Sequence, residues 1–274
     1  SFAEKDKVEY NEEQFKKSEP LIKEQLKAAS YSILGDRPTQ QDAAGMEWAN
    51  ESLFVAVCDG MGGMQGGEFA STTGITTIAD AFRSQRPSEE NKTPEWLHKQ
   101  FDEADRAISG LLDPSGKPLG AGSTVVAAVF WDNRLYWGSV GDSVIYYIKK
   151  GQITTLNRMH NYNLRIDEML KKGEMSPENE AAERVKGEAL ISFLGIRGLP
   201  LVDTNQQPIQ MESGDILLLA SDGLYKSLDP QQIVAIVEES GGNMQITARR
   251  LCENAQRLAV KKQDNTTVVA VMCV

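Results

Sequence analysis

The feature that most constrains this chain is an apolar run that stops at a carboxylate and leads into a glycine-rich segment. Residues 53–57 read Leu-Phe-Val-Ala-Val, which is typical of a strand buried on both faces. Asp59 follows this run, and five glycines lie between residues 60 and 67. Glycines let the backbone turn sharply and approach a ligand closely. The pattern indicates a charge at the end of a buried strand, where a hard cation could bind, although an isolated Asp-Gly pair is more often an ordinary turn.

The same pattern recurs towards the C-terminus. Residues 215–221 form a second apolar run that leads into Asp222, and Asp264 stands just before a last one. Asp42 and Asp142 lie in polar segments that flank other expected strands. If antiparallel strands bring these ends together, the carboxylates share one rim. Two carboxylates about 4 Å apart repel by about 4 kcal/mol at an effective dielectric of about 20, a conflict that divalent cations would remove.

Composition restricts the partners and the ligands. The 274 residues carry 29 basic and 39 acidic side chains, a net charge of −10 that argues against a nucleic acid or an anionic membrane as main partner. No apolar run is as long as a membrane span, and the charged N-terminus does not read as a signal peptide, so we expect a cytoplasmic protein. Three scattered cysteines and two histidines argue against disulfides or a zinc site, which leaves oxygen ligands and magnesium, manganese or calcium.

The order of elements predicts one domain after a charged leader. In the leader, residues 1–29, a helix is expected from Pro20, and the segment could pack on the domain or continue a linker from a larger protein. The domain then spans residues 30–274. Expected helices lie at 68–86, 94–112, 230–240 and 244–262. Expected strands lie at 31–34, 53–57, 123–131, 134–140, 144–148, 152–156, 215–221 and 266–274.

The middle of the chain changes character at residue 157. Before it, short turns at Asp132-Asn133 and Lys150-Gly151 join four of the expected strands, which predicts an antiparallel meander. From 157 to 208 strand signals fade, and a helical piece with acidic segments indicates a flap beside the sheet. A flap in that place would take part in substrate choice; the alternative is a solvated insertion without a role.

The carboxylates and one arginine suggest phosphate chemistry. Asp59 could bridge two cations, and the backbone carbonyl of Gly60 could supply a further oxygen. Two cations about 3.5–4 Å apart activate a water that attacks phosphorus in phosphate esters. Arg37 would hold the phosphoryl group through two parallel hydrogen bonds.

Six motifs, taken in order, resemble the metal-dependent protein phosphatase (protein phosphatase 2C) family, in its bacterial serine/threonine type. They are residues 37–42 (RPTQQD), 59–63 (DGMGG), 122–124 (GST), 140–143 (VGDS), 220–224 (ASDGL) and 264–267 (DNTT). Six ordered motifs are far more specific than any one of them. The resemblance implies an α+β fold, a four-layer α-β-β-α sandwich of two antiparallel sheets flanked by helices. It also implies removal of phosphate from phosphoserine and phosphothreonine.

The resemblance further implies a role for individual residues and a set of cofactors. The implied metal ligands are Asp42, Asp59, Gly60 through its carbonyl, Asp142, Asp222 and Asp264. Two Mn²⁺ or Mg²⁺ ions would bind, with Asp59 bridging them, and Asp142 would share a third, weaker ion with Asp222. Asp59 and Arg37 are the implied catalytic residues, and Arg37 binds the substrate phosphate.

Several positions depart from the family pattern. Met61 replaces a histidine that many members have as a proposed general acid, so a metal-bound water would protonate the leaving group. Gln41 stands where glutamate is frequent and lowers the local charge. Val144 and Met159 replace an arginine and an aspartate, changes that we expect to affect packing near the flap. His160 is interpreted as structural.

Two classes of function follow. The first is a protein phosphatase, a hydrolase of signal transduction that acts on phosphorylated proteins, opposes a serine/threonine kinase and is expected to be a monomer. The alternative is a regulatory phosphoprotein-binding module that keeps the fold with weak or no catalysis. A cysteine-based phosphatase is not indicated, because Cys58 and Cys252 are not followed six places later by arginine.

Overall fold

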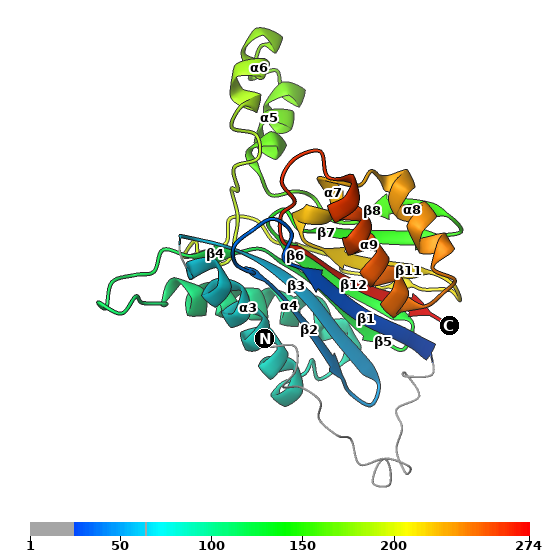
Figure 1. Cartoon of the computed structure of the whole chain (residues 1–274). Coiled ribbons are helices and arrows are strands. Elements are labelled where there is room, and N and C mark those ends of the chain that lie inside the picture. The colour runs from blue at the N-terminus through cyan, green and yellow to red at the C-terminus, as the bar shows by residue number, and fades with distance from the viewer. Residues whose placement is uncertain (1–24, 64) are drawn as a thin grey trace.

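Two antiparallel sheets form the centre of the molecule in the computed structural model, which describes residues 25–63 and 65–274 (Figure 1). The first sheet has the order β1-β12-β11-β7-β8, and the second has the order β10-β6-β5-β3-β2, with β4 and β9 paired to β3 and β6. The strands are β1 (Leu26–Ile33), β2 (Asp42–Trp48), β3 (Ser52–Met61), β4 (Gly122–Ser123), β5 (Val125–Trp131), β6 (Arg134–Val140), β7 (Val144–Lys149), β8 (Gln152–Thr155), β9 (Asp203–Thr204), β10 (Ile209–Gln210), β11 (Ile216–Ala220) and β12 (Thr266–Cys273).

Side chains alternate between two cores along β3, as the two-residue period of a strand requires. Leu53, Val55 and Val57 pack between the sheets, against apolar residues of β11 and β12. The intervening residues, such as Phe54, pack against helices on the other side of the second sheet. Both faces of β3 are therefore buried, as its continuous apolar run predicts.

Helices cover the outer faces of both sheets (Figure 1). Those on the second sheet are α3 (Gly66–Ser84) and α4 (Thr93–Ser109), preceded by the 3-10 turn η2 (Glu90–Lys92), and those on the first are α8 (Pro230–Glu239) and α9 (Met244–Leu258). The predicted four-layer α-β-β-α sandwich is confirmed. Among the described residues, no helix combines the length and the apolarity needed to cross a bilayer.

Three expectations about local structure were wrong. Residues 26–29 form strand rather than helix, because they pair in register with the end of β12; residues 1–24 lie outside the described part of the chain. β6 and β7 do not continue one meander: the chain crosses from the second sheet to the first at Gly141, whose φ of 103° is accessible to glycine. Asp59 lies inside β3, which continues to Met61, rather than after the strand.

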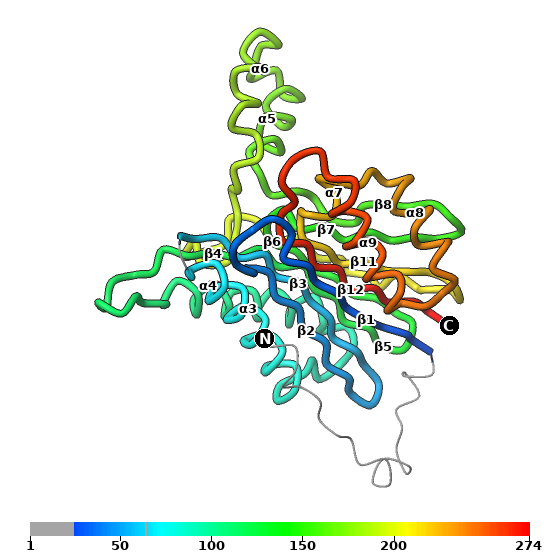
Figure 2. Tube along the Cα trace, in the orientation of Figure 1, coloured from blue at the N-terminus to red at the C-terminus, as the bar shows by residue number. Residues whose placement is uncertain are grey.

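The segment between β8 and β9 projects from the body. It contains α5 (Tyr162–Lys171) and α6 (Pro177–Arg184), which stand out from the sandwich beyond the end of the sheets (Figure 1). The tube in Figure 2 shows two connections leading from this pair of helices back to the strands. The expected helical piece in this region is therefore present.

The start of α3 packs directly on the end of β3, and a glycine makes this possible. The position that a Cβ would take on Gly60 lies 1.8 Å from the carbonyl oxygen of Gly67 and 2.8 Å from that of Gln41. Gly63, in the same glycine-rich segment, has nothing within 4 Å of the equivalent position. Gly60 is required by close packing of the backbone, whereas its carbonyl alone would not require a glycine.

We predict that Gly60→Ala destabilises the fold strongly, because the added methyl group would overlap a backbone oxygen that cannot move alone. Overpacking costs about 1–3 kcal/mol, and we expect Gly60→Ala to reach the upper end of this range because the overlap is with backbone. Chemical denaturation of both variants measures the difference, with Gly63→Ala as the matched control at under about 1 kcal/mol. Equal stability of the two variants would contradict the packing described here.

Candidate metal centre

The second sheet contributes a facing pair of aspartates. Asp42 of β2 is paired directly with Asp59 of β3 in the antiparallel register. Asp59 continues the row of Leu53, Val55 and Val57, so both carboxylates lie at the end of the layer between the sheets. Like charges directly opposite one another destabilise a sheet. The repulsion between the two carboxylates must therefore be offset by other groups.

The first sheet closes on this pair from the other side. Ser221 follows β11 and Thr267 lies in β12, and their hydroxyls donate to Oδ2 of Asp42 over 2.7 Å and 2.8 Å. Asp222 begins the short helix α7 (Asp222–Tyr225) one residue after Ser221, and Asp264 precedes β12. The two sheets thus bring four of the predicted ligands to one end of the sandwich.

Asp142 lies in the turn that carries the chain from one sheet to the other. Its backbone carbonyl accepts a hydrogen bond of 2.8 Å from the hydroxyl of Tyr225. Before it, the N–H of Gly141 donates to Nδ1 of His160 over 3.0 Å, and Nε2 of this buried histidine lies 3.1 Å from Asp203. With Nδ1 accepting from the backbone of Gly141, the neutral imidazole carries its proton on Nε2, so one ring nitrogen holds the turn and the other faces Asp203.

The GST motif connects this turn to β3. The hydroxyl of Thr124 accepts a hydrogen bond of 3.0 Å from the N–H of Asp59 and lies 2.7 Å from the hydroxyl of Ser143. The N–H of Thr124 in turn donates to the carbonyl of Asp59 over 2.9 Å. One small residue therefore fixes the backbone of Asp59 relative to the turn that holds Asp142.

Burial and mutual repulsion disfavour the charged forms of the carboxylates. Burial raises the pKa of Asp42 to about 6, although the Ser221 and Thr267 hydroxyls oppose the shift. Burial, and then the charges of Asp42 and Asp222, raise the pKa of Asp59 well above its usual value. Burial and the charge of Asp222 raise the pKa of Asp142 to about 7. At neutral pH these carboxyl groups therefore favour binding of a positive charge, either a proton or a cation.

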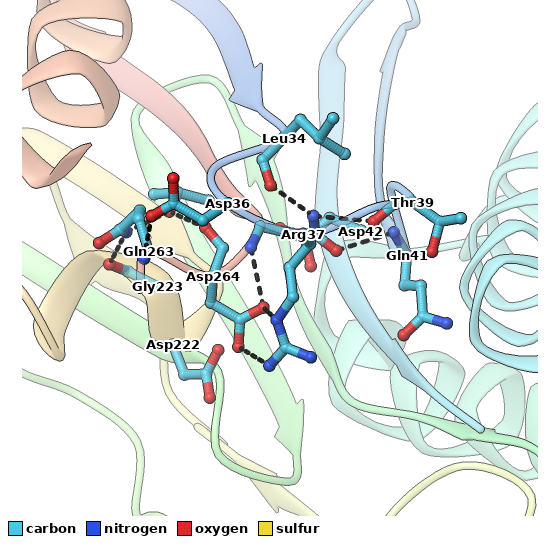
Figure 3. A network of polar contacts seen from close by, with 12 residues as sticks. Leu34, Asp36, Arg37, Thr39, Gln41, Asp42, Asp222, Gly223, Gln263 and Asp264 are labelled. Carbon is cyan, nitrogen blue, oxygen red and sulfur yellow. Dashed lines mark hydrogen bonds and ion pairs between the residues drawn. The ribbon is translucent and has the colours of Figure 1, made fainter. Parts of the chain in front are cut away.

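Two cationic side chains already face the centre. The ammonium of Lys226 lies 2.6 Å from Oδ2 of Asp222, four residues earlier. Arg37 forms two contacts with Asp264, of 3.0 Å and 3.1 Å, through the parallel geometry that its guanidinium favours (Figure 3). Two of the four aspartates that the sheets bring together, Asp222 and Asp264, are thereby paired with cationic side chains.

A cavity of about 450 Å³ opens onto the centre. Its lining residues include Arg37, Asp59, Gly60, Met61, Asp142, Glu188, Leu190, Asp222, Lys226 and Asp264. Glu188 and Leu190 belong to the projecting segment, which therefore contributes to the wall. Asp42 is not part of the lining and lies beneath it, with its carboxylate held by hydroxyls.

Divalent cations fit the donor chemistry of the centre. Oδ1 of Asp42 and Oδ1 of Asp222 are buried and make no hydrogen bond. Buried carboxylate oxygens without donors are the ligands that Mg²⁺ and Mn²⁺ prefer. As the side chains stand, no three His, Cys, Asp or Glu in the described part of the chain are arranged to hold an ion. Asp222 and Asp264 would exchange their contacts with Lys226 and Arg37 for contacts with metal.

The structure adds residues that the sequence did not single out. Lys226 is one, and its signal is the four-residue spacing from Asp222 at a helix start. Asn265 is another: its amide donates to the carbonyls of Leu34 and Thr39 over 2.8 Å and 3.0 Å, and so holds the loop that carries Arg37. No sequence pattern indicates the contacts of Asn265, because they join segments more than 200 residues apart.

We predict that the metal-free protein loses stability as pH rises, since groups with raised folded-state pKa values stabilise the fold in their protonated form. Protonated Asp42 stabilises the fold fully below pH 3.8, its ordinary pKa, and this stabilisation is lost as the pH rises through about 6. The stabilisation from Asp142 is lost as the pH rises through about 7. For Asp42 the loss is on the order of 3 kcal/mol. Mn²⁺ should therefore raise Tm far more at pH 8 than at pH 5.

Thermal unfolding with and without Mn²⁺ measures this effect. Asp59→Asn should raise Tm of the metal-free protein at pH 8 and reduce the gain from Mn²⁺. Asp80→Asn, at an exposed position of α3, should change neither. An equal gain from Mn²⁺ at both pH values would contradict the electrostatic account.

Comparisons with known proteins agree with this geometry. A family model described as protein phosphatase 2C matches residues 32–259. The serine/threonine phosphatase stp of Listeria welshimeri is 30% identical over 226 residues, which cover 80% of this chain and 83% of that protein.

Solved structures are similar over most of the chain. The serine/threonine phosphatase of S. agalactiae superposes with a TM-score of 0.78 at 23% identity, covering 91% of this chain and 100% of the other. The catalytic domain of the phosphatase PstP, solved with 2 manganese ions, gives a TM-score of 0.70 at 25% identity, covering 91% and 99%. On the match to the family model and the identity to stp, this chain belongs to the protein phosphatase 2C family.

Proposed function

We propose that this chain hydrolyses phosphoserine and phosphothreonine in proteins with the help of divalent metal ions. The observation that carries the proposal is that buried and half-buried aspartates from both sheets meet at the floor of one cavity and, for Asp42, beneath it. Membership of the protein phosphatase 2C family supports it, and so do relatives named serine/threonine phosphatases.

The aspartates would hold two Mn²⁺ or Mg²⁺ ions, as the PstP catalytic domain was solved with manganese. When bound, the ions supply the positive charge that activates a water and neutralises the phosphoryl oxygens. Asp59 is paired with Asp42 of its own sheet and is also exposed to the charge of Asp222 from the other sheet, which suits a bridging ligand. Asp264 and the Gly60 carbonyl would complete the set, and Asp142 would share a weaker third ion with Asp222.

Arg37 would bind the phosphoryl group of the substrate. It lines the cavity and is about half exposed, and its partner Asp264 is one of the proposed ligands. With Asp264 serving as a metal ligand, the planar fork of Arg37 would be free to bind two phosphate oxygens. Met61 lines the same cavity and has no proton to give, so the leaving oxygen would take its proton from water.

The wider setting follows from the proposed reaction. Residues 26–274 would act as one catalytic domain, because β1 starts at Leu26 and pairs with β12, and a flap at about 157–208 would contribute Glu188 and Leu190 to the cavity wall. We propose phosphorylated proteins as substrates, an opposing serine/threonine kinase, a cytoplasmic location and a monomeric state. The residues that precede β1 would form a leader to this domain.

We predict Mn²⁺-dependent hydrolysis of a phosphothreonine peptide that Asp59→Asn reduces by at least about 100-fold, because the bridging charge is lost. Phosphate release measured over a Mn²⁺ titration tests this, with Asp80→Asn as the exposed control. Peptide binding without metal-dependent turnover would contradict the enzyme and favour the phosphoprotein-binding module.

We predict that Arg37→Ala raises KM for the peptide by about 10- to 100-fold, the effect of losing a charged hydrogen-bond pair. Arg37→Lys should raise KM nearly as much, since an ammonium group cannot form the two parallel hydrogen bonds. Steady-state kinetics measures both, and Arg83→Ala, which removes an exposed arginine of α3, is the control. An unchanged KM in Arg37→Ala would place phosphate binding elsewhere.

A further inference from the structure

A second groove adjoins the proposed active centre. It has a volume of about 420 Å³ and shares several residues with the first cavity. Its charged lining residues are Arg37, Glu188, Lys226, Lys261, Lys262 and Asp264. Four cations and two carboxylates therefore face a groove on a protein whose net charge is −10. Of these cations the proposed reaction uses Arg37, and it gives no role to Lys226, Lys261 or Lys262.

Two of these cations remain available for a ligand. Arg37 and Lys226 are engaged with Asp264 and Asp222. Lys261 and Lys262 are exposed, and neither forms an ion pair with any residue of the described part of the chain. They follow the end of α9, and Lys261 and Lys262 stand three and two residues before Asp264. The unpaired charge thus lies directly beside a proposed metal ligand.

The loop that carries the two lysines is anchored at its next residue. Gln263 is 2% exposed, and its side-chain amide donates to the carbonyl of Gly223 and to the Thr266 hydroxyl over 2.8 Å and 2.7 Å. Its backbone exchanges hydrogen bonds of 2.7 Å and 2.8 Å with Asp36, just before Arg37 (Figure 3). The backbone next to the two lysines is therefore held in place relative to Arg37, the proposed phosphate-binding residue.

We infer that this groove, lined by Lys261 and Lys262, binds acidic side chains that flank the phosphorylated residue of the substrate. The inference rests on the proposed phosphatase function and names its preferred substrates as acidic phosphopeptides. Successive residues of an extended peptide are about 3.3 Å apart, so a carboxylate one to three residues from the phosphoresidue can reach the neighbouring groove. A carboxylate there gains two ammonium partners that no residue of the described chain occupies.

Paired peptides test the inference. Two phosphothreonine peptides differ only in having glutamate or alanine at the three positions on each side of the phosphoresidue. Wild type should prefer the glutamate peptide by about three- to tenfold in kcat/KM, mainly through KM, as expected for two exposed charge pairs. The preference should shrink as NaCl rises, because salt screens such pairs.

Variants at the two lysines assign the preference to this groove. Lys261→Ala with Lys262→Ala should abolish it, and Lys261→Glu with Lys262→Glu should reverse it. Both variants should hydrolyse p-nitrophenyl phosphate, which has no flanking residues, at the wild-type rate. Lys92→Ala with Lys99→Ala removes the same charge from exposed positions outside the groove and should preserve the preference.

The outcomes separate the two proposals. If the Lys261→Ala, Lys262→Ala variant hydrolyses p-nitrophenyl phosphate normally and keeps the wild-type peptide preference, the inference that the groove binds acidic side chains is wrong. Absence of Mn²⁺-dependent hydrolysis of any substrate would instead overturn the proposed function. Fluorescence anisotropy of the labelled peptides then still tests the groove, since equal affinity of wild type and the double variant for the glutamate peptide would contradict it.

Discussion

Repulsion among aspartates buried between two sheets is the constraint on which the rest of this structure depends. Asp42 and Asp59 face each other across paired strands, and Asp222 approaches them from the opposite sheet. Two of their oxygens are buried without hydrogen bonds. An arrangement of this kind is costly unless positive charge enters it. The fold therefore maintains a place for cations at the expense of its own stability.

Strand geometry explains how remote segments produce this cluster. The two-residue period that sends Leu53, Val55 and Val57 into the inter-sheet core also sends Asp59 there, at the point where the apolar layer ends. Ser221 and Thr267 reach the same layer from the other sheet and hold Asp42. The apolar core and the polar centre are thus successive parts of one layer, so the core fixes the centre.

Much of this could be predicted from the sequence, because the signals are local. Apolar runs ending near Asp59 and Asp222 indicated the strands, and six ordered motifs indicated the fold. The crossing at Gly141 could not be predicted, since a glycine turn between two strands is equally compatible with a hairpin in one sheet. Residues 26–29 were mistaken for helix because their partner, β12, lies more than 200 residues away. Contacts such as those of Asn265 with the carbonyls of Leu34 and Thr39 depend on how remote loops are packed, which periodicity does not specify.

The most direct test of the central claim is anomalous diffraction at the manganese edge from crystals grown with Mn²⁺. We expect two strong peaks among the carboxylates, with Asp59 as ligand to both ions and Arg37 separated from Asp264. Crystals that show no manganese at these aspartates, with the Arg37–Asp264 pair intact, would contradict the account.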